Sequence, residues 1–186
     1  MVAPSQAGQK AAMTNVVVEG LVAGAVGAAV MRVGEKVEQA YTRRPSSSVP
    51  ALTLGRLTGV PDQTAERSTV MNLGMHFGQA ALLGVVRSTM AEGGLRGPWA
   101  SAMFSMLRFS NDQTLENYTG AGAPPWTWPR DELVIDLLHK SVYGFATGWV
   151  ADRLAARRGP GRGAEHANLR SGRHSDVGPP PSRPTR

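Results

Sequence analysis

Apolar and small residues gather in four stretches of this chain, and polar segments separate them. The first stretch covers residues 15–31, in which Glu19 is the only charged residue. The second, residues 68–86, contains 19 residues and no Lys, Arg, Asp or Glu. Residues 97–107 form the third stretch, which extends to residue 110 if Arg108 faces a polar interior, and residues 133–154 form the fourth. The pattern predicts an all-α protein, a bundle of about four helices.

The segments between these stretches contain residues that end helices. Residues 36–67 include Pro45 and Pro50, and we expect a connector there with one short helix. Residues 111–130 hold three prolines together with Trp126 and Trp128. Tryptophan is enriched where a lipid bilayer meets water, so this segment is expected to be an interfacial loop.

The composition of the first stretch favours a membrane over water. Gly20, Gly24 and Gly27 recur at helical spacing. In a water-soluble helix each interior glycine costs about 0.8–1 kcal/mol relative to alanine. In a bilayer such small residues let helix backbones approach closely, so these three are predicted helix-contact residues. We therefore predict a polytopic membrane bundle with the lipid bilayer as its surroundings. A soluble helical binding module is the alternative, because amphipathic helices have a similar pattern.

Charge and composition divide the chain into three parts. Residues 1–14 are expected to be a flexible N-terminal arm, and residues 15–156 the helical membrane domain. Residues 157–186 hold seven Arg with one Glu and one Asp, which is +5 of the net charge of +6. This tail is poor in large apolar residues, so we expect it to be disordered and either solvated or in contact with anionic lipid. The basic charge belongs to the tail, so no nucleic-acid partner is expected.

A few polar residues lie on or beside the apolar stretches and are candidate functional groups. They are Glu35, His76, Asp136 and His139. Ionisable groups at membrane depth are costly and commonly serve in proton or ion pathways. Each also has a purely structural interpretation. Glu35 would form an ion pair with Arg32 one helical turn away, His76 would make an interhelical hydrogen bond, and Asp136 and His139 would contact lipid headgroups.

Several classes of chemistry find no support in the sequence. The chain has no cysteine, which excludes disulfides, thiolate metal sites and cysteine nucleophiles. No phosphate-binding loop, nucleophile elbow or HExxH motif is found. We therefore predict neither an enzyme nor a bound cofactor or metal, although His76 and His139 would form a metal pair if their helices touch. A cleaved secretory signal around residues 10–29 is an alternative to a retained first helix.

Two segments resemble the YagU-like family of bacterial inner-membrane proteins. The first is Gly-Leu-Val-Ala-Gly at 20–24, followed by Met-Arg-Val-Gly-Glu-Lys at 31–36 and a basic stretch with proline. The second is Gly-Ala-Pro-Pro-Trp-Thr-Trp-Pro at 122–129, followed by Ile-Asp-Leu-Leu-His at 135–139. The resemblance implies a multi-pass protein of the cytoplasmic (inner) membrane whose biochemical activity is unassigned.

The expected function is a structural or accessory role in the membrane. A proton- or solute-handling channel or transporter component is the alternative, and a pore would need several copies in a homo-oligomer. The arginine-rich tail predicts a cytoplasmic C-terminus. Four spans then place the basic 36–67 connector outside, against the positive-inside rule, whereas three spans or a re-entrant 97–110 segment would place it inside.

Overall fold

The computed structural model describes residues 6–60, 65–161 and 163, and within them every regular element is a helix. This confirms the all-α prediction. The elements are α1 (Gln6–Thr42), α2 (Val49–Thr58), α3 (Ala65–Glu92), α4 (Pro98–Thr119), the 3-10 turn η1 (Pro125–Thr127) and α5 (Arg130–Ala156). Four helices are long, and α2 is the short helix expected in the connector.

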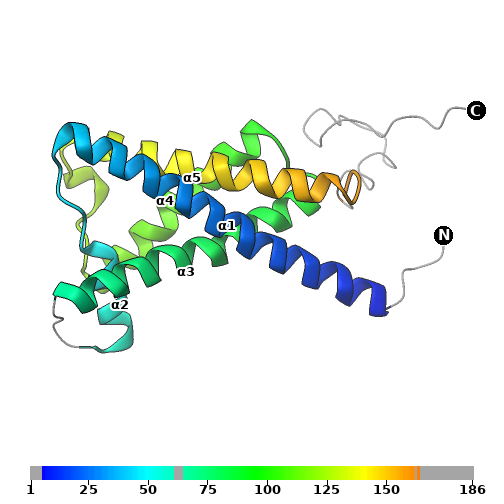
Figure 1. Cartoon of the computed structure of the whole chain (residues 1–186), viewed down its shortest axis with the longest axis horizontal. Coiled ribbons are helices and arrows are strands. Elements are labelled where there is room, and N and C mark those ends of the chain that lie inside the picture. The colour runs from blue at the N-terminus through cyan, green and yellow to red at the C-terminus, as the bar shows by residue number, and fades with distance from the viewer. Residues whose placement is uncertain (1–5, 61–64, 162, 164–186) are drawn as a thin grey trace, which may run out of the picture.

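The four long helices run up and down past one another (Figure 1). α1 packs on α3 and α5, α4 packs mainly on α5, and α2 lies against α3 and α4. The start of α1 and the end of α5 lie at one end of the bundle, here named the terminal end (Figure 1). α2 and η1 lie at the opposite end, here named the connector end, where α1 and α4 end and α3 and α5 begin.

Helix boundaries differ from the predicted ones in three places. α1 begins at Gln6, so residues 6–14 are helical and not a loose arm, because this stretch is rich in good helix formers and has no proline. α1 also continues to Thr42, and α4 continues to Thr119 through a segment predicted as loop. The extension of α4 has neither Gly nor Pro before Gly120, whose φ of 67° ends the helix. Most of the tail, residues 162 and 164–186, lies outside the described residues. The predicted disorder of the tail therefore concerns residues that the structure does not describe.

α1 and α3 touch backbone to backbone at a crossing made of glycines. A Cβ atom on Gly20 would lie 2.4 Å from Val85 Cα, and one on Gly24 would lie 2.2 Å from the carbonyl oxygen of Ala80. From the other side, a Cβ on Gly84 would lie 2.1 Å from the carbonyl oxygen of Gly20. No other residue fits at these positions without separating the helices. The structure thus places Gly20 and Gly24 at a helix contact.

A second set of small residues brings α5 against its neighbours. Gly27 of α1 faces α5, and Gly144 and Gly148 of α5 face the hydroxyls of Ser105 and Ser101 on α4. The core around these contacts contains few large side chains. Its apolar residues are mostly alanines, with one buried pair of rings, Phe104 and Tyr143, whose centroids lie 5.6 Å apart.

We expect Gly24→Ala to destabilise the protein although alanine is the better helix former. Packing an extra methyl against α3 costs about 1–3 kcal/mol, more than the gain of up to about 1 kcal/mol in helix propensity. Gly34→Ala is the matched control on the same helix, because a Cβ there meets nothing within 4 Å. Thermal unfolding followed by circular dichroism measures both, and equal stability of the two variants would contradict the tight crossing.

Candidate functional site

A cavity of about 340 Å³ lies inside the connector end of the bundle. Its walls come from the end of α1, the start of α2, α3, the end of α4, the η1 loop and the start of α5. Ten of its eighteen lining residues carry ionisable side chains. These are Glu35, Arg44, His76, Arg108, Asp112, Glu116, Glu132, Asp136, His139 and Lys140.

The four candidate residues named from the sequence all line this cavity. Glu35 comes from α1, His76 from α3, and Asp136 and His139 from α5. They converge because α1, α3 and α5 pack on one another and each turns its polar stripe inward. His76 and His139 therefore share one cavity. Across the described ranges, however, no three metal-binding side chains are grouped as a metal site.

Six charged residues of the site are not among the four candidates named from the sequence, and three of these six lie on α4. Arg108, Asp112 and Glu116 are spaced four residues apart, so they form one line along the helix and face the cavity. The spacing was visible in the sequence. The three prolines of residues 111–130 favour a loop for that whole segment, which hides the continuation of this line beyond residue 110.

Asp112 is the centre of the polar network and links three helices. Its carboxylate accepts hydrogen bonds from Gln79 Nε2 of α3 at 2.9 Å and from Arg108 Nε of α4 at 3.0 Å. The Lys140 ammonium of α5 lies 3.5 Å from it and donates to Asp136 at 2.5 Å. Arg108, Asp112 and Lys140 are all buried. Buried charges are stable only when paired, so this network fixes how α3, α4 and α5 sit together.

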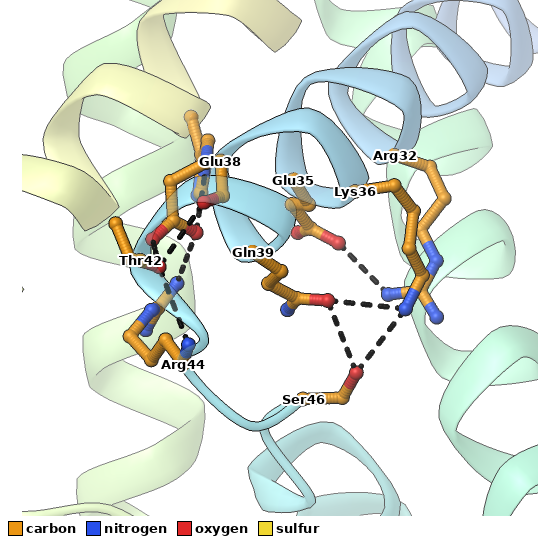
Figure 2. Close-up of polar contacts among 9 residues, drawn as sticks. Arg32, Glu35, Lys36, Glu38, Gln39, Thr42, Arg44 and Ser46 are labelled. Carbon is orange, nitrogen blue, oxygen red and sulfur yellow. Dashed lines mark hydrogen bonds and ion pairs between the residues drawn. The ribbon is translucent and has the colours of Figure 1, made fainter.

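The end of α1 forms the rim of the cavity through two separate sets of contacts (Figure 2). The Arg32 guanidinium donates to Glu35 at 2.8 Å, which is the local ion pair of the structural interpretation of Glu35. One turn further on, Glu38 accepts from Thr42 at 2.6 Å and from Arg44 at 3.3 Å.

The chain leaving α1 is tied back to the helix (Figure 2). Ser46 Oγ lies 3.3 Å from both Lys36 Nζ and Gln39 Oε1, and these two are joined by a hydrogen bond of 3.1 Å. The connector to α2 is thereby held beside the cavity, which fixes the position of Arg44 on the cavity wall.

Several polar atoms around the cavity have no hydrogen-bond partner. They include Arg108 Nη1, Arg44 Nε, His76 Nε2 and Asp136 Oδ2, each of which is buried. Two are donors on guanidinium groups and one is a carboxylate acceptor. A buried polar atom without a partner costs about 1–3 kcal/mol, so these atoms are unsatisfied polar groups on residues of the cavity wall.

Glu116 lies in the last turn of α4, past the apolar part of that helix and next to the loop that forms the cavity mouth. Within the described part of the chain its carboxyl group makes no hydrogen bond or ion pair. Burial raises the pKa of Glu116 to about 7, and the nearby Lys140 ammonium offsets this only in part. The group therefore changes its charge near neutral pH.

At the terminal end a second ion pair closes the interior. The Arg87 side chain is fully buried, and it lies 2.8 Å from Asp152 of α5. The backbone N–H of Gly97 also donates to Asp152, at 2.8 Å. Nearer the surface, Arg158 pairs with Glu19 and Glu92. Glu19, the only charge in the first apolar stretch, thus has an ion-pair partner.

Comparisons with models of known protein families, with curated proteins and with solved structures found no match to this chain. The site is therefore interpreted from its own geometry, and the resemblance noted in the sequence stays a prediction.

Removing Asp152 should destabilise the protein strongly. Asp152→Ala leaves the fully buried Arg87 guanidinium without its carboxylate, and breaking a buried pair in this way costs about 3–5 kcal/mol. Glu92→Ala, which breaks an exposed pair at the same end, should cost less than about 1 kcal/mol. Denaturant unfolding of the purified protein measures both, and similar losses for the two variants would show that the Arg87 pair is not buried.

The raised pKa of Glu116 predicts a pH-dependent stability. The unfolded carboxyl group loses its proton near pH 4.5 and the folded one near 7. Between these values the folded state binds more protons, so the contribution of Glu116 to stability falls as pH rises through this window. The melting temperature of Glu116→Gln relative to wild type should therefore rise from pH 4.5 to 7. A difference that is constant over this range would contradict a protonated carboxyl group.

Proposed function

We propose that the chain is an integral protein of the cytoplasmic membrane with four spanning helices, α1, α3, α4 and α5. The observation that carries this proposal is the inverted polarity of the bundle. Large apolar side chains cover its outside, while charged and hydroxyl-bearing residues fill its inside. A water-soluble bundle has the opposite arrangement.

The outward faces of α1 and α3 carry no exposed charge over long stretches, about 24 Å in α1 and about 30 Å in α3. Between Val17 and Val33 every exposed residue of α1 is apolar, chiefly valine. Between Thr69 and Thr89 no exposed residue of α3 is charged, a length of about 30 Å at 1.5 Å per residue. This equals the thickness of a bilayer's hydrocarbon core, about 30 Å.

Composition alone supports two spans, in α1 and α3, and such helices also occur as the buried cores of soluble proteins. Here that alternative fits poorly, because only 39% and 11% of their most apolar windows are buried. α4 and α5 have lower hydropathy, since charges lie among their apolar residues. In the middle of these helices the charged residues Arg108, Asp112, Asp136 and Lys140 face the interior, and the exposed charges of α5 lie near its two ends. The outward faces carry large apolar residues: Trp99, Met103, Met106 and Leu107 on α4, and Val134, Leu138, Phe145 and Trp149 on α5.

Exposed tryptophans at the two ends of the bundle agree with this placement. Trp99, at the start of α4, is 76% exposed, and Trp126, in η1 at the connector end, is 82% exposed. Indole rings favour the interface between lipid and water. A soluble binding module would leave these rings and the apolar belt in water.

Within this placement we favour a solute-handling role over a purely structural one. A structural helix bundle has no need of an interior cavity with ten ionisable side chains, three of them buried in one network. The arginine-rich tail favours a cytoplasmic terminal end, which puts the cavity mouth on the other side of the membrane. The basic residues of the 36–67 connector conflict with this orientation by the positive-inside rule. Two of them have partners: Arg44 pairs with Glu38, and Arg56 donates to the carbonyl oxygen of Thr119.

Membrane fractionation tests the placement. The expressed chain should remain in the membrane pellet after alkaline carbonate washing and should need detergent for release. Val26→Lys, on the lipid-facing side of α1, should lower the inserted yield, because a lysine near a helix centre costs about 2.5–3.5 kcal/mol to insert. Val37→Lys, near the end of α1, is the control and should insert normally. Recovery of the wild-type protein in the supernatant without detergent would refute the proposal.

A further inference from the structure

We propose that the connector-end cavity binds a small zwitterion, a molecule that carries an ammonium and a carboxylate group, such as an amino acid. This deepens the proposed solute-handling function and rests on it for its biological meaning. The binding chemistry itself is argued from the unpartnered atoms of the cavity wall.

Arg108 provides the clearest contact for a carboxylate. Its side chain is only 4% exposed, and its Nε is held by Asp112 at 3.0 Å, which fixes the plane of the guanidinium group. Tyr143 lies under that plane, with its ring centroid 5.1 Å from the guanidinium carbon. Nη1 has no partner although it is buried. A preorganised arginine with a free N–H is the group best suited to a carboxylate. Arg44 adds a second free donor, Nε, to the same cavity.

Carboxylates on α4 and α5 provide the contacts for an ammonium group. One oxygen of Asp136 accepts from Lys140, while the other, Oδ2, is buried without a partner. Glu116 faces the same cavity and makes no bond of its own in the described residues. Both acceptors remain available after every ion pair of the wall is formed.

Single ions fit this wall less well than a zwitterion does. An anion bound at Arg108 would lie in a cavity whose lining holds five carboxylates and three permanent cations. The described ranges contain no group of three metal-binding side chains that could hold a metal ion. The Lys140 ammonium already lies between Asp112 and Asp136. A zwitterion satisfies free donors and free acceptors together. The cavity's volume of about 340 Å³ lies within the range of small-molecule sites, roughly 300–1,000 Å³.

The test is ligand binding to the purified full-length protein in detergent at pH 7, measured by thermal shift and calorimetry. The probes are L-alanine, β-alanine and L-leucine. Ethylamine and propionate serve as controls, because each carries only one of alanine's two charged groups. At least one zwitterion should raise the melting temperature and bind at least tenfold more tightly than either control. The proposal is overturned if no zwitterion binds, or if ethylamine or propionate alone binds as tightly.

Variants locate the site. Glu116→Gln removes an acceptor that pairs with nothing else, so the protein should fold normally and bind the zwitterion at least tenfold more weakly. Asp136→Asn should weaken binding likewise, whereas Glu92→Gln at the terminal end should leave it unchanged. Equal affinity of Glu116→Gln, Asp136→Asn and wild type would place the binding elsewhere and overturn the assignment. If the protein is found in the membrane but binds no zwitterion, only this inference is refuted. If the protein is soluble but binds a zwitterion, only the membrane placement is refuted.

Discussion

The carboxylate of Asp112 is the interaction on which the architecture of the bundle depends. It is buried, it accepts hydrogen bonds from Gln79 and Arg108, and it forms an ion pair with Lys140, so three helices meet at one group. The cost of taking these charges out of water is offset only while all partners are in place. This requirement sets the register of α3, α4 and α5. The glycines of α1 then allow α1 to close over α3 without large side chains between them.

Much of this arrangement could be predicted from the sequence, and the parts that could not have a common cause. The four long helices follow from the spacing of apolar stretches, and the stripe of Asp136, His139 and Lys140 on α5 follows from helical periodicity. The α4 line from Arg108 to Glu116 has the same periodicity but was missed. Polar composition and nearby prolines favour a loop there, whereas in the structure the polar residues at every fourth position line the inside of a helix. Which helices touch depends on tertiary packing, and that the sequence alone could not show.

The bundle has its charged residues inside and its large apolar residues outside, which explains why hydropathy alone finds only two of the proposed spans. Averaging along α4 and α5 mixes inward charges with outward leucine, methionine, phenylalanine and tryptophan. The average is low although the outward face is apolar. In the proposed membrane placement lipid contacts only that face, so the direction in which each charge points matters more than how many charges a helix contains.

The two ends of the interior are built differently, and this limits what the bundle can do as it stands. The connector end holds an open, charged cavity with unpartnered atoms, whereas the terminal end is sealed by the fully buried Arg87 with Asp152. Between them Ser101 and Ser105 of α4 press against glycines of α5, with no space for a solute. A molecule in the cavity is therefore accessible from one side only. Passage across a membrane would require α5 to move away from α4 and the Arg87 pair to separate, which is the behaviour of a carrier rather than of a static pore.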